Sequence, residues 1–277
     1  MRVLLTNDDG IDAPGLGALY AALVAAGRFA RIDVAAPSKV QSATSHAVTF
    51  HRPIDAAAQP LHALAGHGVE GFAVGGRPAD CVKLALCGAL EGEPVAYDLV
   101  ISGMNAGANV GINVLYSGTV GAAREATFEG LPAIAVSLHL NDWEHDHWPR
   151  AAAHAADAIA RVLDDAPGHG LGPGSLVNIN VPVLDGGAEP RGLRLCPIAK
   201  TPMVAGYNVQ THPDGTRSFT AKHGMDFGDF EAGTDVDLLF RRFVTLSPMH
   251  FDLTCDDTLA AWAGFGRALE SEEAARA

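Results

Sequence analysis

The chain has 277 residues, 48% of them hydrophobic, and a formal net charge of −13 at pH 7. This length and apolar content predict a globular protein with a large buried core and exclude a disordered chain. The acidic balance argues against a nucleic-acid polymer or an anionic membrane as partner, because both would repel the protein.

Cysteine usage and the lack of long apolar runs indicate the compartment. Four cysteines without a CxxC pair are too few for a disulfide framework in a chain this long. No apolar run approaches the roughly 20 residues of a membrane span, and the acids at positions 8 and 9 come too early for a signal peptide. We therefore expect a cytoplasmic protein with reduced thiols.

Strand-like and helix-like segments alternate along the first two thirds of the chain. In chain order we expect a strand at 3–7, a helix from 13 to near 27, a strand at 32–36, a helix at 79–90, a strand at 97–102, a helix at 120–128, a strand at 133–138, a helix at 151–163 and a strand at 175–181. This alternation predicts an α/β fold with a mostly parallel sheet.

A polar and aromatic segment, residues 141–150, interrupts this pattern and is expected to form a loop. His145 and His147 lie in it with the H-x-H spacing of some zinc ligands. Because no cysteine is nearby, an exposed loop is favoured over a zinc site.

The pattern changes beyond residue 181. Short strands are expected at 208–210 and 218–221, on either side of the turn signal Asp214-Gly215, and together they predict a hairpin. A strand at 243–246, a helix at 257–265 and a frayed tail at 270–277 complete the expected elements.

Asp8 and Asp9 stand side by side at the end of the first expected strand, and Gly10 follows. Ligands of open parallel sheets bind beyond the carboxyl ends of the strands, so two acids there are placed to hold a cation. Adjacent negative charges also destabilise the fold unless a cation offsets them. The alternative is a solvated turn, since Asp and Gly are common in turns, and these residues alone leave both interpretations open.

Three further segments rich in small polar residues follow expected strands or open an expected helix, at 36–46, 102–111 and 116–123. If neighbouring strands bring them to one rim, carboxylates, a serine hydroxyl and an asparagine carbonyl can converge on Mg²⁺ or Mn²⁺, which prefer hard oxygen ligands. The Ser-Gly-Thr run at 117–119 opens a helix and can present N–H groups and hydroxyls to a phosphate.

Six motifs occur in the order in which one known family carries them. They are Asn7-Asp8-Asp9-Gly10, Ala36-Pro37 with Ser42, Gly76-Arg77-Pro78-Ala79-Asp80-Cys81-Val82, Ser102-Gly103-Met104-Asn105, Tyr116-Ser117-Gly118-Thr119-Val120 and Gly233-Thr234-Asp235. Through these motifs the chain resembles the SurE survival-protein family from Met1 to about Thr254.

The resemblance implies a fold and an assembly. We expect one SurE-like α/β domain over residues 1–277, with a Rossmann-like three-layer core, a mostly parallel sheet and a C-terminal β-hairpin arm at about 196–247. The extended C-terminal portion serves oligomerisation in this family, so the resemblance implies a homodimer or homotetramer.

The resemblance also implies an activity and its residues. The family consists of metal-dependent 5'/3'-nucleotidases, so the expected substrate is a nucleoside monophosphate and the expected cofactor is one divalent ion per subunit, Mg²⁺ or Mn²⁺. Carried over by motif, the catalytic residues are Asp8 and Asp9, the metal ligands are Asp8, Asp9, Ser42 and Asn105, and the phosphate contacts are Asn105, Ser117, Gly118 and Thr119.

Three stretches depart from the family pattern. Arg77 stands where the family usually has Thr, Arg241-Arg242-Phe243 stands where it usually has a Gly-Tyr pair, and residues 219–224 lack the usual tryptophan and double glycine. These departures concern nucleoside preference and oligomer contacts more than the metal site.

Our mechanistic hypothesis is that a metal-activated water attacks phosphorus in line, with an aspartate as proton acceptor. Direct attack by Asp8 is the alternative, and trapping of an aspartyl-phosphate would establish it. Water is favoured as the nucleophile because two adjacent acids both bind a metal more easily than one of them stays free to attack phosphorus.

Five residues near the motifs have structural interpretations. We expect Asp80 to cap a helix or to place a charge in its first turn. Cys81 is expected to fill the core and Asp235 to fix a loop through backbone hydrogen bonds. A lone loop histidine such as His46 is usually structural or solvated. Asn109 could contact phosphate or adopt a left-handed turn, and both interpretations stay open.

Other classes of protein fit the sequence less well. A receiver-like regulatory domain that binds Mg²⁺ would need an acceptor Asp after its third strand, and Asp55 has no strand-like run before it. A dinucleotide-binding oxidoreductase would need a Gly-rich turn where Asp8 and Asp9 stand. A haloacid-dehalogenase-type phosphatase would need Asp-x-Asp spacing. Within phosphate chemistry, the runner-up activity is an exopolyphosphatase or a broad phosphomonoesterase.

Overall fold

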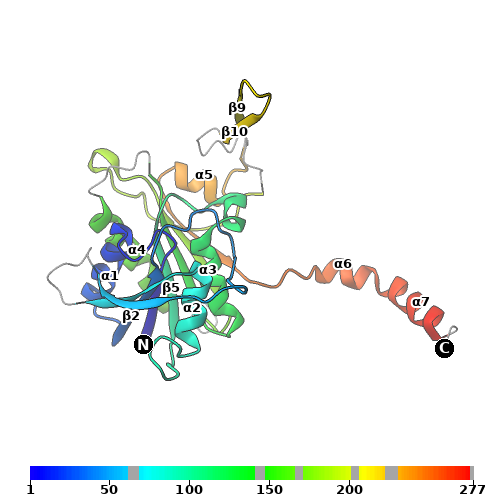
Figure 1. The fold of residues 1–277 in the computed structure, drawn as a ribbon, viewed down its shortest axis with the longest axis horizontal. Helices are drawn as coiled ribbons and strands as arrows, with labels where there is room; N and C mark the ends of the chain where they lie inside the picture. The colour runs from blue at the N-terminus through cyan, green and yellow to red at the C-terminus, as the bar shows by residue number, and fades with distance from the viewer. Residues whose placement is uncertain (62–68, 141–146, 166–170, 201–205, 222–229, 275–277) are drawn as a thin grey trace.

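The computed structural model describes residues 1–61, 69–140, 147–165, 171–200, 206–221 and 230–274. Its centre is a nine-stranded sheet with the order β3-β4-β2-β1-β5-β6-β7-β11-β8 (Figure 1). The strands are β1 (Arg2–Thr6), β2 (Arg31–Pro37), β3 (Ala56–Pro60), β4 (Glu70–Val74), β5 (Leu99–Ala106), β6 (Ala133–Leu138), β7 (Leu176–Val181), β8 (Leu193–Leu195) and β11 (Val244–Met249).

The six neighbouring strands β4-β2-β1-β5-β6-β7 run parallel to one another. Each of them forms a parallel ladder with the next strand in this order. The two edges differ. β3 runs antiparallel to β4, and β11 runs antiparallel to β7 with β8 parallel to β11. The predicted α/β class and mostly parallel sheet are confirmed.

Helices cover both faces of the sheet, giving three layers. On one face lie α1 (Pro14–Ala25) and α4 (Trp148–Asp165), and on the other α2 (Pro78–Leu86) and α3 (Gly118–Phe128). Alternate side chains of β1 serve the two cores. Val3 and Leu5 pack with the first pair of helices and Leu4 with the second. A strand buried on both faces explains the continuous apolar run at the start of the chain.

The C-terminal third adds elements outside this core. A hairpin of β9 (Tyr207–Thr211) and β10 (Arg217–Ala221) stands away from the body, as predicted, with Ser218 opposite Gln210 (Figure 1). Helix α5 (Asp235–Phe240) packs near the loop after β5. Helices α6 (Asp256–Ala261) and α7 (Ala263–Ala274) form a tail that leaves the body. Two short 3-10 turns, η2 (Gly111–Leu115) and η3 (Asp185–Gly187), complete the chain.

Several boundaries differ from the prediction for local reasons. Helix α2 ends at Leu86 instead of Leu90, because Gly88 takes a positive φ of 77° that ends the helix. Helix α4 begins at Trp148, inside the segment expected to be a loop, and His145 lies outside the described residues. The predicted last helix forms two helices, which meet at Trp262. The second helix continues to Ala274, so the prediction that the chain frays from residue 270 was wrong for residues 270–274.

Strands β3, β4 and β8 and helix α5 were not predicted. No helix among the residues the structure describes is both long and apolar enough to span a membrane.

Candidate active site

The turn after β1 presents Asp8 and Asp9 at the carboxyl end of the central strand. Asn7 closes this turn, since its Nδ2 donates to the Gly10 carbonyl at 2.8 Å and its Oδ1 accepts from the Gly10 N–H at 3.1 Å. Gly10 has a φ of 101°, which favours glycine. The Ile11 N–H then donates to the Pro37 carbonyl at 2.9 Å, which ties the turn to the end of β2.

Asp8 is almost fully buried, and the hydroxyl of Thr119 donates a hydrogen bond to its Oδ1. Burial raises the pKa of Asp8 to about 6, with a smaller contribution from the charge of Asp9, and the hydrogen bonds from Thr119 oppose this rise. Asp9 is less buried and accepts the Ala106 N–H at 2.8 Å, while burial raises its pKa as well. Both carboxylates are therefore held by neutral donors in surroundings that penalise their charge.

The first turn of α3 packs directly against Asp8. A Cβ on Gly118 would lie 2.9 Å from the Asp8 Cβ, closer than real contacts allow, so this position requires glycine. Ser117 caps the helix, and its Oγ accepts the Val120 N–H at 3.0 Å. Ser117 and Gly118 thus lie at the same rim as the acids. The hydroxyl of Thr119 is used in the hydrogen bond to Asp8.

The loop after β2 closes over the acids from another side. The Gln41 N–H donates to the Asp8 carbonyl at 2.7 Å, and Ser42 follows with an exposed side chain. On its other side the loop is fixed to η2, because the Ser45 Oγ donates to the Leu115 carbonyl at 2.6 Å. Ser42 therefore sits on a loop that is anchored at both ends, one residue from a direct contact with Asp8.

An ion cluster centred on the buried Glu125 joins the far end of this loop to α2 and α3. His46 Nε2 lies 2.6 Å from Glu125 Oε2, and Lys83 Nζ donates to Glu125 Oε1 at 2.8 Å. The His46 ring also lies 5.0 Å from the ring of Phe128, centroid to centroid. The structural interpretation of His46 is thereby supported, and the partners Glu125 and Lys83 were not singled out in the sequence.

Asn105 is the penultimate residue of β5, next to Ala106, which contacts Asp9. Its Nδ2 donates to the Gly107 carbonyl at 2.6 Å, which leaves its Oδ1 as an acceptor, and the next residue, Ala106, donates to Asp9. A shift in strand register between Ser102 and Asn105 turns this strand end. The structure thus brings Asp8, Asp9 and Asn105 together, with the Ser42 loop and the Ser117–Thr119 turn around them.

The donor set fits a hard divalent cation. In the part of the chain that the structure describes, no lysine, arginine or histidine forms an ion pair with Asp8 or Asp9. The same described residues hold no group of three or more His, Cys, Asp or Glu side chains suited to a metal. A metal at this rim would therefore combine two carboxylates with hydroxyl, amide and water oxygens, as Mg²⁺ and Mn²⁺ accept.

Three other motif residues have structural roles, as predicted. Asp80 accepts hydrogen bonds from the Arg77 N–H at 2.8 Å and from the Thr49 hydroxyl at 2.7 Å. Cys81 is fully buried. Asp235 accepts the N–H groups of Gly111 at 2.9 Å and Ala199 at 2.8 Å.

Asn109 belongs to a buried amide network beyond β5. Its N–H donates to Asn180 Oδ1 at 2.8 Å and its Nδ2 to the Ser137 hydroxyl at 2.8 Å. Asn178 and Asn180 both donate to its carbonyl, at 2.7 and 3.0 Å. Asn109 is not among the described residues with positive φ, so the left-handed turn was wrong.

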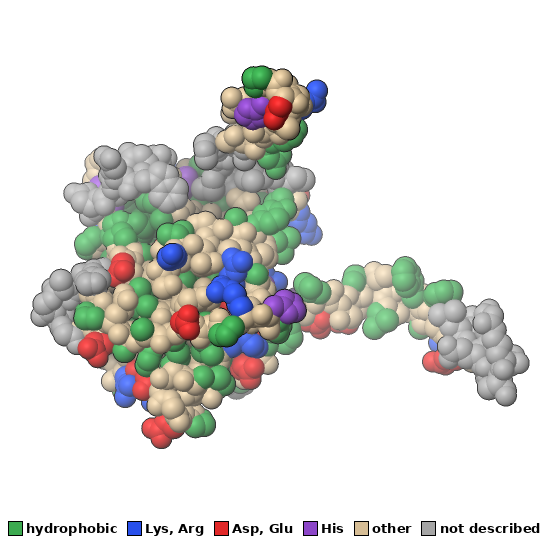
Figure 2. All heavy atoms as spheres, viewed as in Figure 1, with side chains coloured by type: hydrophobic (Ala, Val, Ile, Leu, Met, Phe, Trp, Pro, Cys, Tyr) green, Lys and Arg blue, Asp and Glu red, His purple; other side chains and the backbone are tan. Residues whose placement is uncertain are grey.

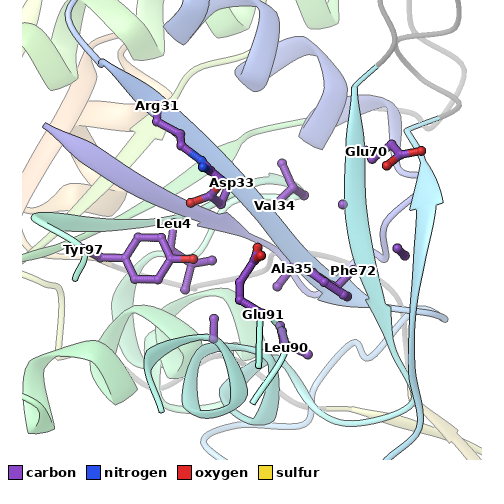
Figure 3. Close-up of a pocket in the computed structure, with 13 residues that line it drawn as sticks. Leu4, Arg31, Asp33, Val34, Ala35, Glu70, Phe72, Leu90, Glu91 and Tyr97 are labelled. Carbon is purple, nitrogen blue, oxygen red and sulfur yellow. The ribbon is translucent and has the colours of Figure 1, made fainter. Parts of the chain in front are cut away.

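A separate cavity of about 250 Å³ lies at the opposite, amino ends of the strands (Figure 3). One side of the cavity is lined by Tyr97 and Glu91, and the other side is lined by Glu70. Asp33 on β2 lies between these two sides. Arg2 and Arg31 both pair with Asp33 at 2.6 Å. The cavity contains none of the predicted site residues, and its central carboxylate already holds two structural ion pairs.

Comparisons with known proteins agree on one family. The family model "Survival protein SurE" matches residues 3–204. A protein of Nitratidesulfovibrio vulgaris (strain DP4) named 5'-nucleotidase SurE is 40% identical over 263 residues, covering 95% of this chain and 98% of its own. A protein of Desulfovibrio desulfuricans with the same name is 42% identical over 267 residues, covering 94% of this chain and 97% of its own.

A solved structure supports the same assignment. The crystal structure of the SurE protein from Aquifex aeolicus superimposes with a TM-score of 0.76 at 29% sequence identity, covering 94% of this chain and 98% of that one. Sequence motifs, fold and the arrangement of the acidic rim are therefore consistent with one another. The chain belongs to the SurE family.

Proposed function

We propose that this protein is a metal-dependent 5'/3'-nucleotidase that hydrolyses nucleoside monophosphates to nucleoside and phosphate. Relatives about 40% identical over nearly the whole chain carry the name 5'-nucleotidase. The observation that carries the proposal is the pair of buried Asp8 and half-buried Asp9. This pair has no cationic partner among the described residues, and Asp8 packs against the N-terminal turn of α3.

Asp8, Asp9, Ser42 and Asn105 would hold one Mg²⁺ or Mn²⁺ ion. When bound, such an ion lowers the pKa of a water and withdraws charge from a phosphoryl oxygen. Thr119 fixes the Asp8 carboxylate for this task, as the Ala106 N–H fixes that of Asp9. The Asn105 Nδ2 donates to the Gly107 carbonyl, which leaves the side-chain carbonyl oxygen available as a ligand.

The substrate phosphate would lie between these acids and the start of α3. Ser117 and Gly118 open the helix, where N–H groups and the helix dipole favour an anion. The Ser117 oxygen accepts the Val120 N–H, so its own O–H remains able to donate to a phosphate oxygen. Asn105 and the backbone of Thr119 complete the proposed contacts.

Water is the favoured nucleophile, with Asp9 as the better placed proton acceptor. Asp8 is nearly enclosed and already accepts the Thr119 hydroxyl, which leaves it little freedom to reach phosphorus. Asp9 keeps an exposed fraction and one backbone donor. Burial raises the pKa of Asp9, which makes its carboxylate a stronger base.

The deciding experiment measures phosphate release from AMP, GMP and 3'-AMP with Mn²⁺, Mg²⁺ or EDTA. We expect release only with metal, and a fall in kcat of at least about a hundredfold in Asp9→Asn, because a metal ligand contributes several kcal/mol to the transition state. Asp157→Asn, an exposed acid on α4, is the matched control and should match the wild type.

Metal-independent release, or an Asp9→Asn variant as active as the Asp157→Asn control, would refute the proposal. Tripolyphosphate in the same panel tests the exopolyphosphatase alternative.

A further inference from the structure

Arg77 points a guanidinium toward the rim that carries Asp8. It follows β4 and caps α2, where its N–H donates to Asp80 at 2.8 Å. Its Nη1 donates to the side-chain carbonyl of Gln41 at 2.9 Å, and the Gln41 N–H donates to the Asp8 carbonyl at 2.7 Å. The side chain therefore reaches inward from β4, across the loop after β2, toward the acids after β1.

The charge of Arg77 is not neutralised by the described part of the protein. Its side-chain partner there is the neutral amide of Gln41, and no described acid pairs with it. One of its five N–H donors is used, and the side chain is only half-buried. The exposed Lys39, two residues before Gln41, adds a second positive charge to the same loop. The planar guanidinium group, with N–H donors still available, matches the geometry of a phosphate.

The sheet order gives the distance between this cation and the acids. The strands run in the order β4-β2-β1, and neighbouring strands lie about 4.8 Å apart. The strand ends that lead to Arg77 and to Asp8 are therefore separated by roughly 10 Å along the rim. A phosphate held at Asp8 and Asp9 therefore leaves room for the sugar of a nucleotide before Arg77 is reached.

We infer that Arg77 contacts a second phosphate group carried by the substrate, so that a nucleoside 3',5'-bisphosphate is preferred over the corresponding monophosphate. The inference rests on the proposed function, because it assumes that the first phosphate binds at Asp8 and Asp9. It adds a substrate class and a specificity-determining residue to that function.

The test compares kcat/KM for adenosine 3',5'-bisphosphate and for AMP, both with Mn²⁺, in the wild type, Arg77→Gln and Arg77→Lys. We expect the ratio of the two values to fall about tenfold in Arg77→Gln, the size of one charge-assisted hydrogen bond, and to recover in part in Arg77→Lys. Arg161→Gln removes an exposed positive charge on α4 and should leave the ratio unchanged.

Added salt separates an electrostatic contact from a structural effect. Raising NaCl should lower the ratio in the wild type and not in Arg77→Gln, because salt screens an exposed charge. Tripolyphosphate serves as a third substrate. A loss confined to the bisphosphate supports the inference, whereas a loss confined to tripolyphosphate overturns it, because the second phosphate would then belong to a linear chain.

An unchanged ratio of bisphosphate to AMP in Arg77→Gln would also overturn the inference. If the wild type releases no phosphate from AMP, the proposed function fails separately. The inference is then tested by titration calorimetry with the same proteins. The wild type should bind the bisphosphate more tightly than AMP, and Arg77→Gln should lose this difference.

Discussion

At the residue scale, Thr119 decides how Asp8 is presented. Its hydroxyl is fully buried and donates to Asp8 Oδ1, while its neighbour Gly118 has no side chain and lets the carboxylate approach the helix. A residue that orients a metal ligand in this way affects metal affinity without touching the metal.

Replacing Thr119 by valine tests this role, because valine keeps the shape and removes the hydroxyl. We expect the affinity for Mn²⁺ to fall about tenfold or more, as is usual when the partner of a metal ligand is lost. Mn²⁺ titration with purified protein measures it. Thr127→Val is the control, since Thr127 is also buried on α3 but bonds to the Arg124 carbonyl at 2.6 Å. Equal affinities in the two variants would contradict the role.

At the element scale, the cluster of His46, Lys83 and Glu125 joins the loop after β2 to α2 and α3. Burial alone would raise the pKa of Glu125, but the hydrogen bonds from His46 and Lys83 outweigh it and hold the pKa below its ordinary value of 4.5. The charged carboxylate is therefore favoured by folding. Its contribution to stability is complete above pH 4.5 and is lost as the pH falls through the lowered pKa.

The variant Glu125→Gln should accordingly be less stable than the wild type at pH 7, by about 2 kcal/mol, since two hydrogen bonds to a charged group are weakened. The difference should shrink as the pH falls below 4.5 and through the lowered pKa of the wild-type carboxylate. Urea unfolding at both pH values measures it. Glu129→Gln, exposed at the end of the same helix, should show neither effect. A constant difference across pH would refute the ionic role.

The sequence predicts those helices and strands that are determined by the local pattern of apolar and polar residues. Five parallel strands, β1, β2, β5, β6 and β7, were predicted because buried strands of this kind produce continuous apolar runs such as Ala133–Leu138. β3 was missed because its sequence, Ala-Ala-Ala-Gln-Pro, is mostly exposed and forms only through antiparallel pairing with β4. Propensity does not identify strands whose stability comes from a neighbour.

The candidate site was predictable to a similar extent. Motif order named Asp8, Asp9 and Asn105, and strand topology brings them to one rim. The contacts of Thr119 with Asp8 and of Arg77 with Gln41 join residues far apart in the chain. Only the folded structure gives such side-chain pairings.

At the scale of the whole molecule, the hairpin and the C-terminal tail carry apolar side chains that face solvent (Figure 2). The most exposed large ones are Tyr207, Val209 and Phe219 on the hairpin and Leu253, Leu259, Trp262 and Phe265 at the tail. Soluble monomers rarely expose so many large apolar side chains on projecting segments, and a second copy of the chain would bury them.

We predict a homo-oligomer in which the tail lies in an interface. Light scattering after size-exclusion chromatography should give a multiple of the single-chain mass, reduced in the triple variant Leu259→Ser, Trp262→Ser, Phe265→Ser. Val24→Ser, an exposed apolar residue on α1, is the control and should leave the mass unchanged. A wild type that elutes as a single chain at every concentration would refute this.

The direction of β1 has a practical consequence. Met1 is 45% exposed at the amino end of this strand, and its five residues span about 17 Å before the chain reaches Asp8. An affinity tag or surface tether joined at Met1 would therefore hold the molecule by the end of the sheet opposite the acidic rim. Immobilised protein would present Asp8, Asp9 and Arg77 to the flowing solution, which suits this chain to binding measurements on a sensor surface.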